Sequence, residues 1–302
     1  MVQRSLILCL FLFVVSIMLF AQESVELQVP EGFVLVKAGS FRMGSESTPE
    51  ADAAEYGGKA DQYVNEKPAH WVTISRSFYM SQFEVTQKQW EDVMGTNPFY
   101  PKGENLPVWN LSWYNAVQYC NRLSQKEGLV PCYTIDKELK DANNIAKTDS
   151  YKWTITCDFL ANGYRLPTEA EWEFAAKGGE MGQSFAFSGS NSVEEVGWYS
   201  DNSGNKIQPV GQLKPNELGL YDMSGNVMEW CWDWFGDYTK SSRTDPTGPS
   251  SGTARIRRGG RFNFVVRSLR STARDYSTPS APDSLMEWLH GTAGLRPART
   301  AE

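Results

Sequence analysis

Turn residues interrupt this chain along its whole length and limit the folds open to it. Its 302 residues include 25 glycines and 15 prolines, and few stretches between them show the apolar spacing of a helix. Short strand-like runs stand at 33–44, 70–86 and 255–262. We therefore expect an α+β protein with much irregular structure.

Three helices are predicted from the residues at their ends. In the third, Thr168 and Glu171 form a capping box directly after a proline, so that each side chain satisfies a free backbone amide of the first turn. Glycines close the three stretches. The predicted helices cover 86–95, 112–128 and 167–178.

The N-terminus is typical of an export signal. An apolar run from Leu6 to Phe20 follows Arg4 and contains no acidic residue; it is shorter than the roughly 20 residues that span a bilayer. We expect cleavage after Ala21, with an uncleaved anchor as the alternative. A lipoprotein needs a cysteine directly after the run, and Cys9 lies inside it, which argues against lipid attachment.

Removal of residues 1–21 leaves a short N-terminal extension, 22–32, and one domain, 33–300. No run of like charges and no repeat interrupts that domain. Export predicts a place at the cell surface or in the periplasm, with contact to a membrane only through possible anchoring.

Four cysteines follow the signal, and an oxidising compartment permits disulfides between them. Cys132 and Cys157 flank two strand-like runs that could pair as a hairpin, and we expect these two to be bonded. Cys120 and Cys231 stand among aromatic residues and are expected to be buried thiols. With two histidines in the chain and no CxxC spacing, no zinc site is expected.

Five motifs, taken in order, resemble the formylglycine-generating enzyme family, also called sulfatase-modifying factors. This resemblance implies a C-type lectin fold whose C-terminal segment, about 258–297, lines the functional surface. The motifs are "FVLVKAGSFRMGS" (33–45), "FEVTQKQW" (83–90), "ANGYRLPTEAEWEFAAKGG" (161–179), "GLYDMSGNVMEWCWDW" (219–234) and "RRGG" (257–260).

The resemblance also indicates missing chemistry. Enzymes of this family bind copper(I) through two cysteines shortly after the Arg-Gly-Gly turn, since soft thiolates select that metal. The matching positions hold Phe264 and Leu269, and no cysteine follows Cys231. Neither copper nor oxidation of a sulfatase cysteine is therefore expected. The alternative is an enzyme of the same family with altered chemistry, although an iron-dependent branch would need more histidines than this chain has.

A calcium loop is a further implication of the resemblance. The family's loop supplies hard oxygen ligands from positions that correspond to Asp222, Gly225, Val227 and Glu229. A purely structural interpretation is equally open, in which Asp222 caps a turn and Glu229 pairs with an arginine.

The stretch 257–279 is strongly basic in a chain of formal net charge −7. A nucleic-acid interface would need a broad basic surface with stacking aromatics, and the acidity of the rest of the chain argues against one. Some of the arginines are better explained as a structural frame that ties irregular loops to carboxylates and carbonyls. The frame positions matched in relatives are Arg258, Arg270, Arg274 and Arg296.

Between the frame positions the residues resemble those of the family's variable proteins, which diversity-generating retroelements rewrite at adenines. An AAC codon changed in this way gives Phe, Val, Ser, Asp or Tyr, or stays Asn. Ordinary drift after loss of the cysteines is the alternative. The predicted display positions, which would bind an unidentified protein or surface ligand, are Arg261, Asn263, Phe264, Val265, Arg267, Ser268, Asp275, Tyr276, Ser277, Met286, Trp288 and His290.

Overall fold

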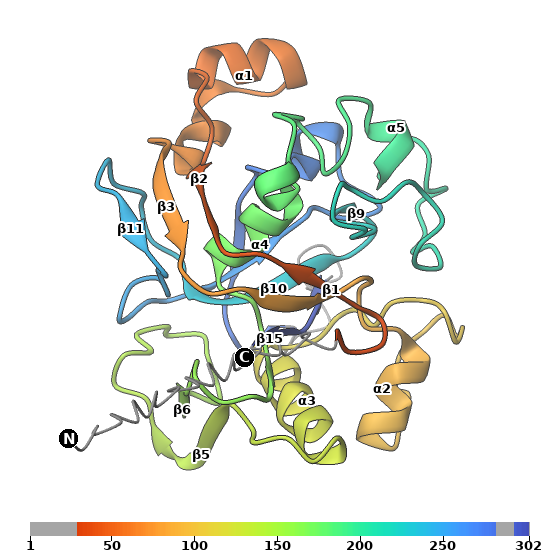
Figure 1. Cartoon of the computed structure of the whole chain (residues 1–302), viewed down its shortest axis with the longest axis vertical. Coiled ribbons are helices and arrows are strands. Elements are labelled where there is room, and N and C mark those ends of the chain that lie inside the picture. Colours follow the sequence, from red (N-terminus) through yellow and green to blue (C-terminus); the bar gives the residue numbers. More distant parts are fainter. Residues whose placement is uncertain (1–28, 282–292, 302) are drawn as a thin grey trace, which may run out of the picture.

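A computed structural model describes residues 29–281 and 293–301, and Figure 1 shows many short strands with a few helices packed among them. The α+β prediction is confirmed. The strands are β1 (Phe33–Val36), β2 (Gly39–Met43), β3 (His70–Ile74), β4 (Phe78–Ser81), β5 (Tyr133–Lys140), β6 (Trp153–Cys157), β7 (Tyr164–Arg165), β8 (Gly197–Trp198), β9 (Ser224–Gly225), β10 (Met228–Trp234), β11 (Arg243–Thr244), β12 (Arg255–Arg258), β13 (Asp275–Ser277), β14 (Ala293–Gly294) and β15 (Ala298–Thr300).

The strands form small sheets that mix distant parts of the chain. One has the order β1-β4-β15-β7, a second β13-β12-β10-β14 and a third β11-β3-β2, and two further pairs are β5-β6 and β8-β9. In the second sheet, β12 and β13 pair antiparallel and β10 pairs in parallel with β14. Both ends of the C-terminal segment are thereby attached to the same sheet.

All three predicted helices are present. The Thr168–Glu171 capping box forms as expected, and Gly178 after that helix has a φ of +86°. Figure 1 shows α4 near the middle of the molecule, with α1 on one side and α2 and α3 on the other. The helices are α1 (Pro49–Tyr56), η1 (Ala60–Glu66), α2 (Gln87–Met94), α3 (Trp113–Lys126), α4 (Glu169–Ala176), η2 (Gly179–Met181), α5 (Val193–Val196) and η3 (Val266–Leu269).

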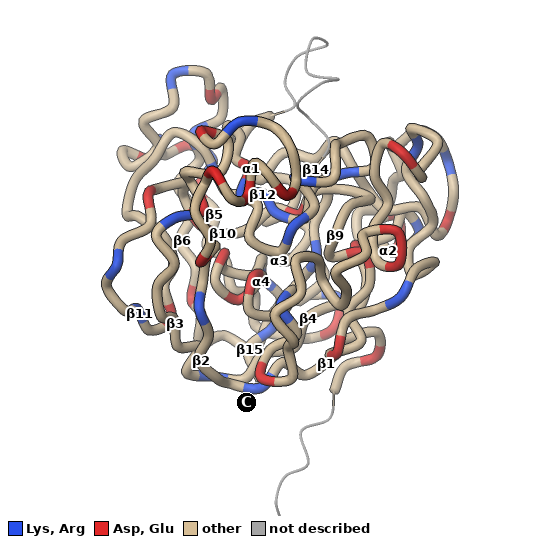
Figure 2. The backbone as a smooth tube through the Cα atoms, turned by 90° about the horizontal axis from the view of Figure 1, so that it is seen from above, with Lys and Arg blue, Asp and Glu red and all other residues tan. Residues whose placement is uncertain are grey.

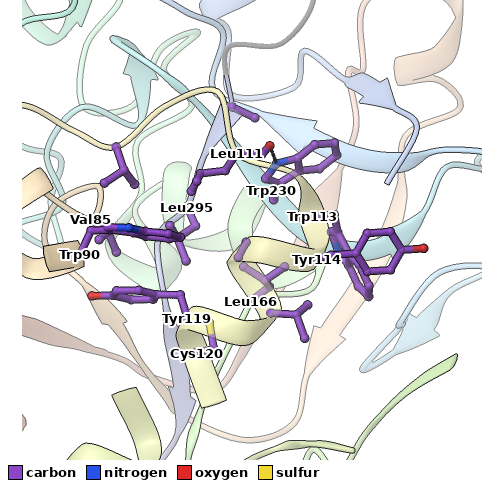
Figure 3. Close-up of a cluster of buried hydrophobic side chains, with 14 of the residues drawn as sticks. Val85, Trp90, Leu111, Trp113, Tyr114, Tyr119, Cys120, Leu166, Trp230 and Leu295 are labelled. Carbon is purple, nitrogen blue, oxygen red and sulfur yellow. Dashed lines mark hydrogen bonds between the residues drawn. The ribbon is translucent and has the colours of Figure 1, made fainter. Parts of the chain in front are cut away.

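Aromatic side chains dominate the larger core cluster, part of which is drawn in Figure 3. The Trp90 and Tyr119 rings stack with centroids 5.3 Å apart, and the Trp230 indole donates to the Leu111 carbonyl at 2.8 Å. Burial of such large rings stabilises a chain with few regular hydrogen-bonded elements. A second cluster packs α4 against β2, β3 and β4.

The hairpin prediction is confirmed, but the disulfide prediction is wrong. β5 and β6 pair antiparallel with Tyr133 opposite Cys157, while Cys132 and Cys157 are both free thiols. Cys132 stands in a bend one residue before β5, so it has no paired position opposite Cys157. Its sulfur lies 3.2 Å from the Gly163 carbonyl oxygen instead. Cys120 and Cys231 are buried thiols, as expected.

Several predicted features lie outside the described residues, namely the signal peptide at 1–21, the extension up to residue 28, and the display positions Met286, Trp288 and His290. Within 29–281 and 293–301, no helix combines the length and the apolar character needed to cross a membrane.

Candidate ligand-binding surface

The C-terminal segment leaves the second sheet through two adjacent glycines. Gly259 and Gly260, directly after β12, have φ angles of +92° and +73°, which side chains strongly disfavour. A Cβ at Gly260 would also lie 2.6 Å from the Ser268 carbonyl oxygen. This turn lets the backbone double back over itself before η3, so that residues 261–274 cross the surface as an irregular loop.

Arg258 anchors the start of this loop beneath the surface. Its guanidinium is fully buried and lies 2.9 Å from a Glu169 carboxylate oxygen and 2.6 Å from one of Glu173. It also donates to the Ser271 carbonyl at 2.7 Å. Both acids belong to α4, and their charges compensate the cost of burying the guanidinium.

Two further arginines tie the loop to distant parts of the chain. Arg270 forms a bidentate pair with Glu66 of η1, at 2.9 and 2.5 Å. Arg274 binds Glu169 through two nitrogens, at 2.6 and 2.8 Å, and its guanidinium stacks 3.9 Å from the Tyr238 ring centroid. Planar, bidentate geometry of this kind is available to arginine and not to lysine.

Arg296, the fourth predicted frame residue, holds the end of the segment. It is completely buried, donates to Glu229 from two nitrogens, the shortest contact being 2.7 Å, and also reaches the Ser81 and Tyr221 carbonyls. All four frame side chains therefore have buried partners.

The intervening side chains have a different environment. Val265 and Tyr276 are the most open, with 45% and 49% of their surface exposed, and the Tyr276 ring rests on Phe235 with centroids 4.0 Å apart. The other described display positions except Arg261 are partly exposed, and a hollow of about 70 Å³ lies among some of them. These partly exposed positions are Asn263, Phe264, Arg267, Ser268, Asp275 and Ser277.

Arg261 differs from the other predicted display residues, because only 3% of it is exposed. Its guanidinium lies 3.8 Å from the Phe264 ring centroid. Burial, together with the nearby Arg257 guanidinium, lowers the pKa of Arg261 to about 10. Arg261 therefore lies beneath the Phe264 ring and is not itself part of the exposed surface.

The basic stretch is largely neutralised by acids from elsewhere in the fold. Arg258 and Arg274 share Glu169, Arg270 takes Glu66, and Arg257 pairs with Asp275 at 2.5 Å. Figure 2 shows basic and acidic positions interspersed over the molecule. Four of the six arginines of the stretch 257–279 are therefore paired with acids within the fold.

Phe264 and Leu269 stand at the two positions that the resemblance matches to the copper-binding cysteines of the enzymes. Both side chains pack among apolar residues. Leu269 is completely buried with Phe187, Val193 and Tyr199, and Phe264 packs against the same cluster. These contacts join η3 to α5 and the loops around it.

Two of the four predicted calcium ligands, Asp222 and Glu229, have polar contacts within the protein. Glu229 is engaged by Arg296 and accepts the Trp172 indole N–H at 2.6 Å, while one Asp222 oxygen accepts the Gly211 amide and the other is buried without a partner. The contacts match the structural interpretation, with Gly225 in a left-handed turn (φ +101°) and Val227 in the core.

Sequence reasoning missed the element that holds Arg270. η1 and the preceding α1 were not expected, although Thr48 before Pro49 is a recognisable helix start, and the Thr48 hydroxyl caps α1 by accepting from the Ala51 amide. No sequence signal links Glu66 to an arginine more than 200 positions away.

Comparison with known proteins shows which family this fold belongs to. The family model of the "Sulfatase-modifying factor enzyme 1-like domain" matches residues 20–296, so the chain belongs to this family of formylglycine-generating enzyme relatives. Its fold is the C-type lectin-like fold of such proteins.

The chain is similar to proteins that carry different functional names. A solved structure, Treponema denticola variable protein 1, is 33% identical with a TM-score of 0.73 and covers 88% of this chain and 94% of its own. The "Chaperone protein LppX" of Paenibacillus barcinonensis is 45% identical over 77% of this chain and 79% of its own length. A formylglycine-generating enzyme of Thermomonospora curvata is 36% identical over 84% and 91%.

Proposed function

We propose that this protein is an exported, non-catalytic binding protein that presents diversified side chains of segment 258–297 to a protein or other surface ligand. The observation that carries the proposal is the division within that segment. Frame arginines are buried in ion pairs, while Val265 and Tyr276 stand about half exposed between them. A scaffold that tolerates rewriting needs this separation, because exposed positions accept substitution at little cost in stability.

The exposed residue types suit a binding surface. Tyrosine is enriched in binding hot spots, so the half-exposed Tyr276 suits contact with a partner, and Val265 adds exposed apolar surface. The similarity to a protein called a variable protein supports the same assignment.

Coding sequences from sister isolates test the proposal directly. We expect nonsynonymous differences to concentrate at adenine-containing template codons of the display positions and to spare Arg258, Arg270 and Arg274. A nearby template repeat and a reverse-transcriptase gene should accompany them. Differences spread evenly over residues 33–300 would contradict diversification.

The competing function is enzymatic, since a formylglycine-generating enzyme is among the relatives. Packing of Phe264 and Leu269 into an apolar cluster supports the non-catalytic assignment, because apolar side chains offer copper no ligand. We expect no formylglycine when the protein is incubated with copper(I), oxygen and a sulfatase-derived cysteine peptide and analysed by mass spectrometry. Conversion above a no-protein control would overturn this assignment.

A further inference from the structure

A groove of about 500 Å³ lies between α1 and the residues that follow α4. Aromatic side chains of Tyr56, Trp71 and Phe185 line it, and Trp71 is 52% exposed. The groove touches the display segment only near Arg270 and Thr272, so its properties are independent of the display positions.

Glu217, which also lines the groove, has an unusual environment. Both of its carboxylate oxygens are buried and neither has a hydrogen-bond partner. The neighbouring Asn216 side chain donates to the Ala175 carbonyl at the end of α4, and a Cβ on Gly178 would lie 2.5 Å from a Glu217 oxygen. The carboxylate thus sits beside the negative end of α4, where an unpaired anion is destabilising.

The basic side chains that line the groove are already engaged. Arg42 binds Glu46 at 3.0 Å and the Ala69 carbonyl. Lys177 lies 2.7 Å from Glu173 and donates to the Arg42 carbonyl. Arg270 is paired with Glu66. Among the described residues, none of these three cations forms an ion pair with Glu217.

We propose that this groove binds an organic cation, an ammonium or guanidinium group, with Glu217 as its counter-ion. The unpaired Glu217 carboxylate supplies the negative charge, and the aromatic walls suit a cation on an alkyl stem. Glu55, a further acid on the groove, adds to the same potential. A bare metal ion is less suited, because the described chain gathers no three ligating side chains anywhere.

Titration calorimetry with agmatine and cadaverine tests the proposal on the mature protein. We expect binding by the parent protein and a dissociation constant raised by about tenfold or more in Glu217→Gln, a loss equivalent to about 1.4 kcal/mol. Glu46→Gln is the matched control, because Glu46 lines the same groove but is exposed and already paired. It should change the constant by about twofold or less.

Thermal melts without ligand show whether the Glu217→Gln variant is folded as stably as the parent. Glu217→Gln should melt no lower than the parent, because the amide removes an unpaired buried charge while keeping the shape. Absence of binding by both amines at millimolar concentration, equal binding by the two variants, or Glu217-dependent stabilisation by calcium chloride in place of the amines would each overturn the proposal.

Discussion

The side chains of Arg258, Arg270 and Arg296 are buried. Each guanidinium donates hydrogen bonds to a carboxylate and to a second acceptor. Hydrogen bonds from these side chains therefore take the place of the backbone hydrogen bonds that regular strands would provide in this irregular segment. The arginine positions were predictable from the resemblance, but their partners were not, since Glu66 lies 204 residues from Arg270 in sequence. Which carboxylate pairs with which arginine depends on tertiary packing, and no local sequence pattern predicts it.

Asp222 gives a pH-dependent prediction at the same scale. Burial raises the pKa of Asp222 to about 6 from its ordinary 3.8, so the folded state holds this proton more tightly than the unfolded state. Stability should then fall as pH rises from about 4 to about 6, by an amount on the order of 1–3 kcal/mol.

The variant Asp222→Asn removes this titration and can keep the bond from the Gly211 amide, and asparagine tolerates the left-handed φ of +58°. Urea melts in chelator at pH 4 and pH 7 should show the variant gaining stability relative to the parent at the higher pH. An equal difference at both pH values would contradict the burial of an ionising carboxylate.

Helices and strands were predicted where local signals are strong. The capping pairs at Thr168 and Glu171 and the glycine after α4 fixed that helix well, and the β5–β6 pairing followed from two strand-like runs. The disulfide prediction failed because spacing in sequence does not reveal register, and the register places Tyr133, the residue after Cys132, opposite Cys157. α1 and η1 were missed because they are short and weakly apolar, yet they carry Glu66 to the segment it secures.

Under the proposed function, the whole molecule presents a variable surface on a fixed interior, and the free energy of unfolding of single variants reports which residues belong to each. Display positions at 286, 288 and 290 lie outside the described residues, so the test rests on Val265 and Tyr276. The sequence predicted this division in outline, but it could not place Arg261, which the fold buries under Phe264. Its burial depends on how the loop after Gly260 doubles back, which a linear pattern does not encode.

Denaturant unfolding of single variants measures this division most directly. Arg270→Ala should lower the free energy of unfolding by about 3–5 kcal/mol, because it leaves buried Glu66 without its partner. Val265→Ser should cost about 0.5 kcal/mol or less, and Tyr276→Ser about 1 kcal/mol or less, since its ring is half exposed and contacts Phe235 on one side. If Val265→Ser and Tyr276→Ser destabilise the protein as much as Arg270→Ala does, these side chains belong to the core and the display surface does not exist.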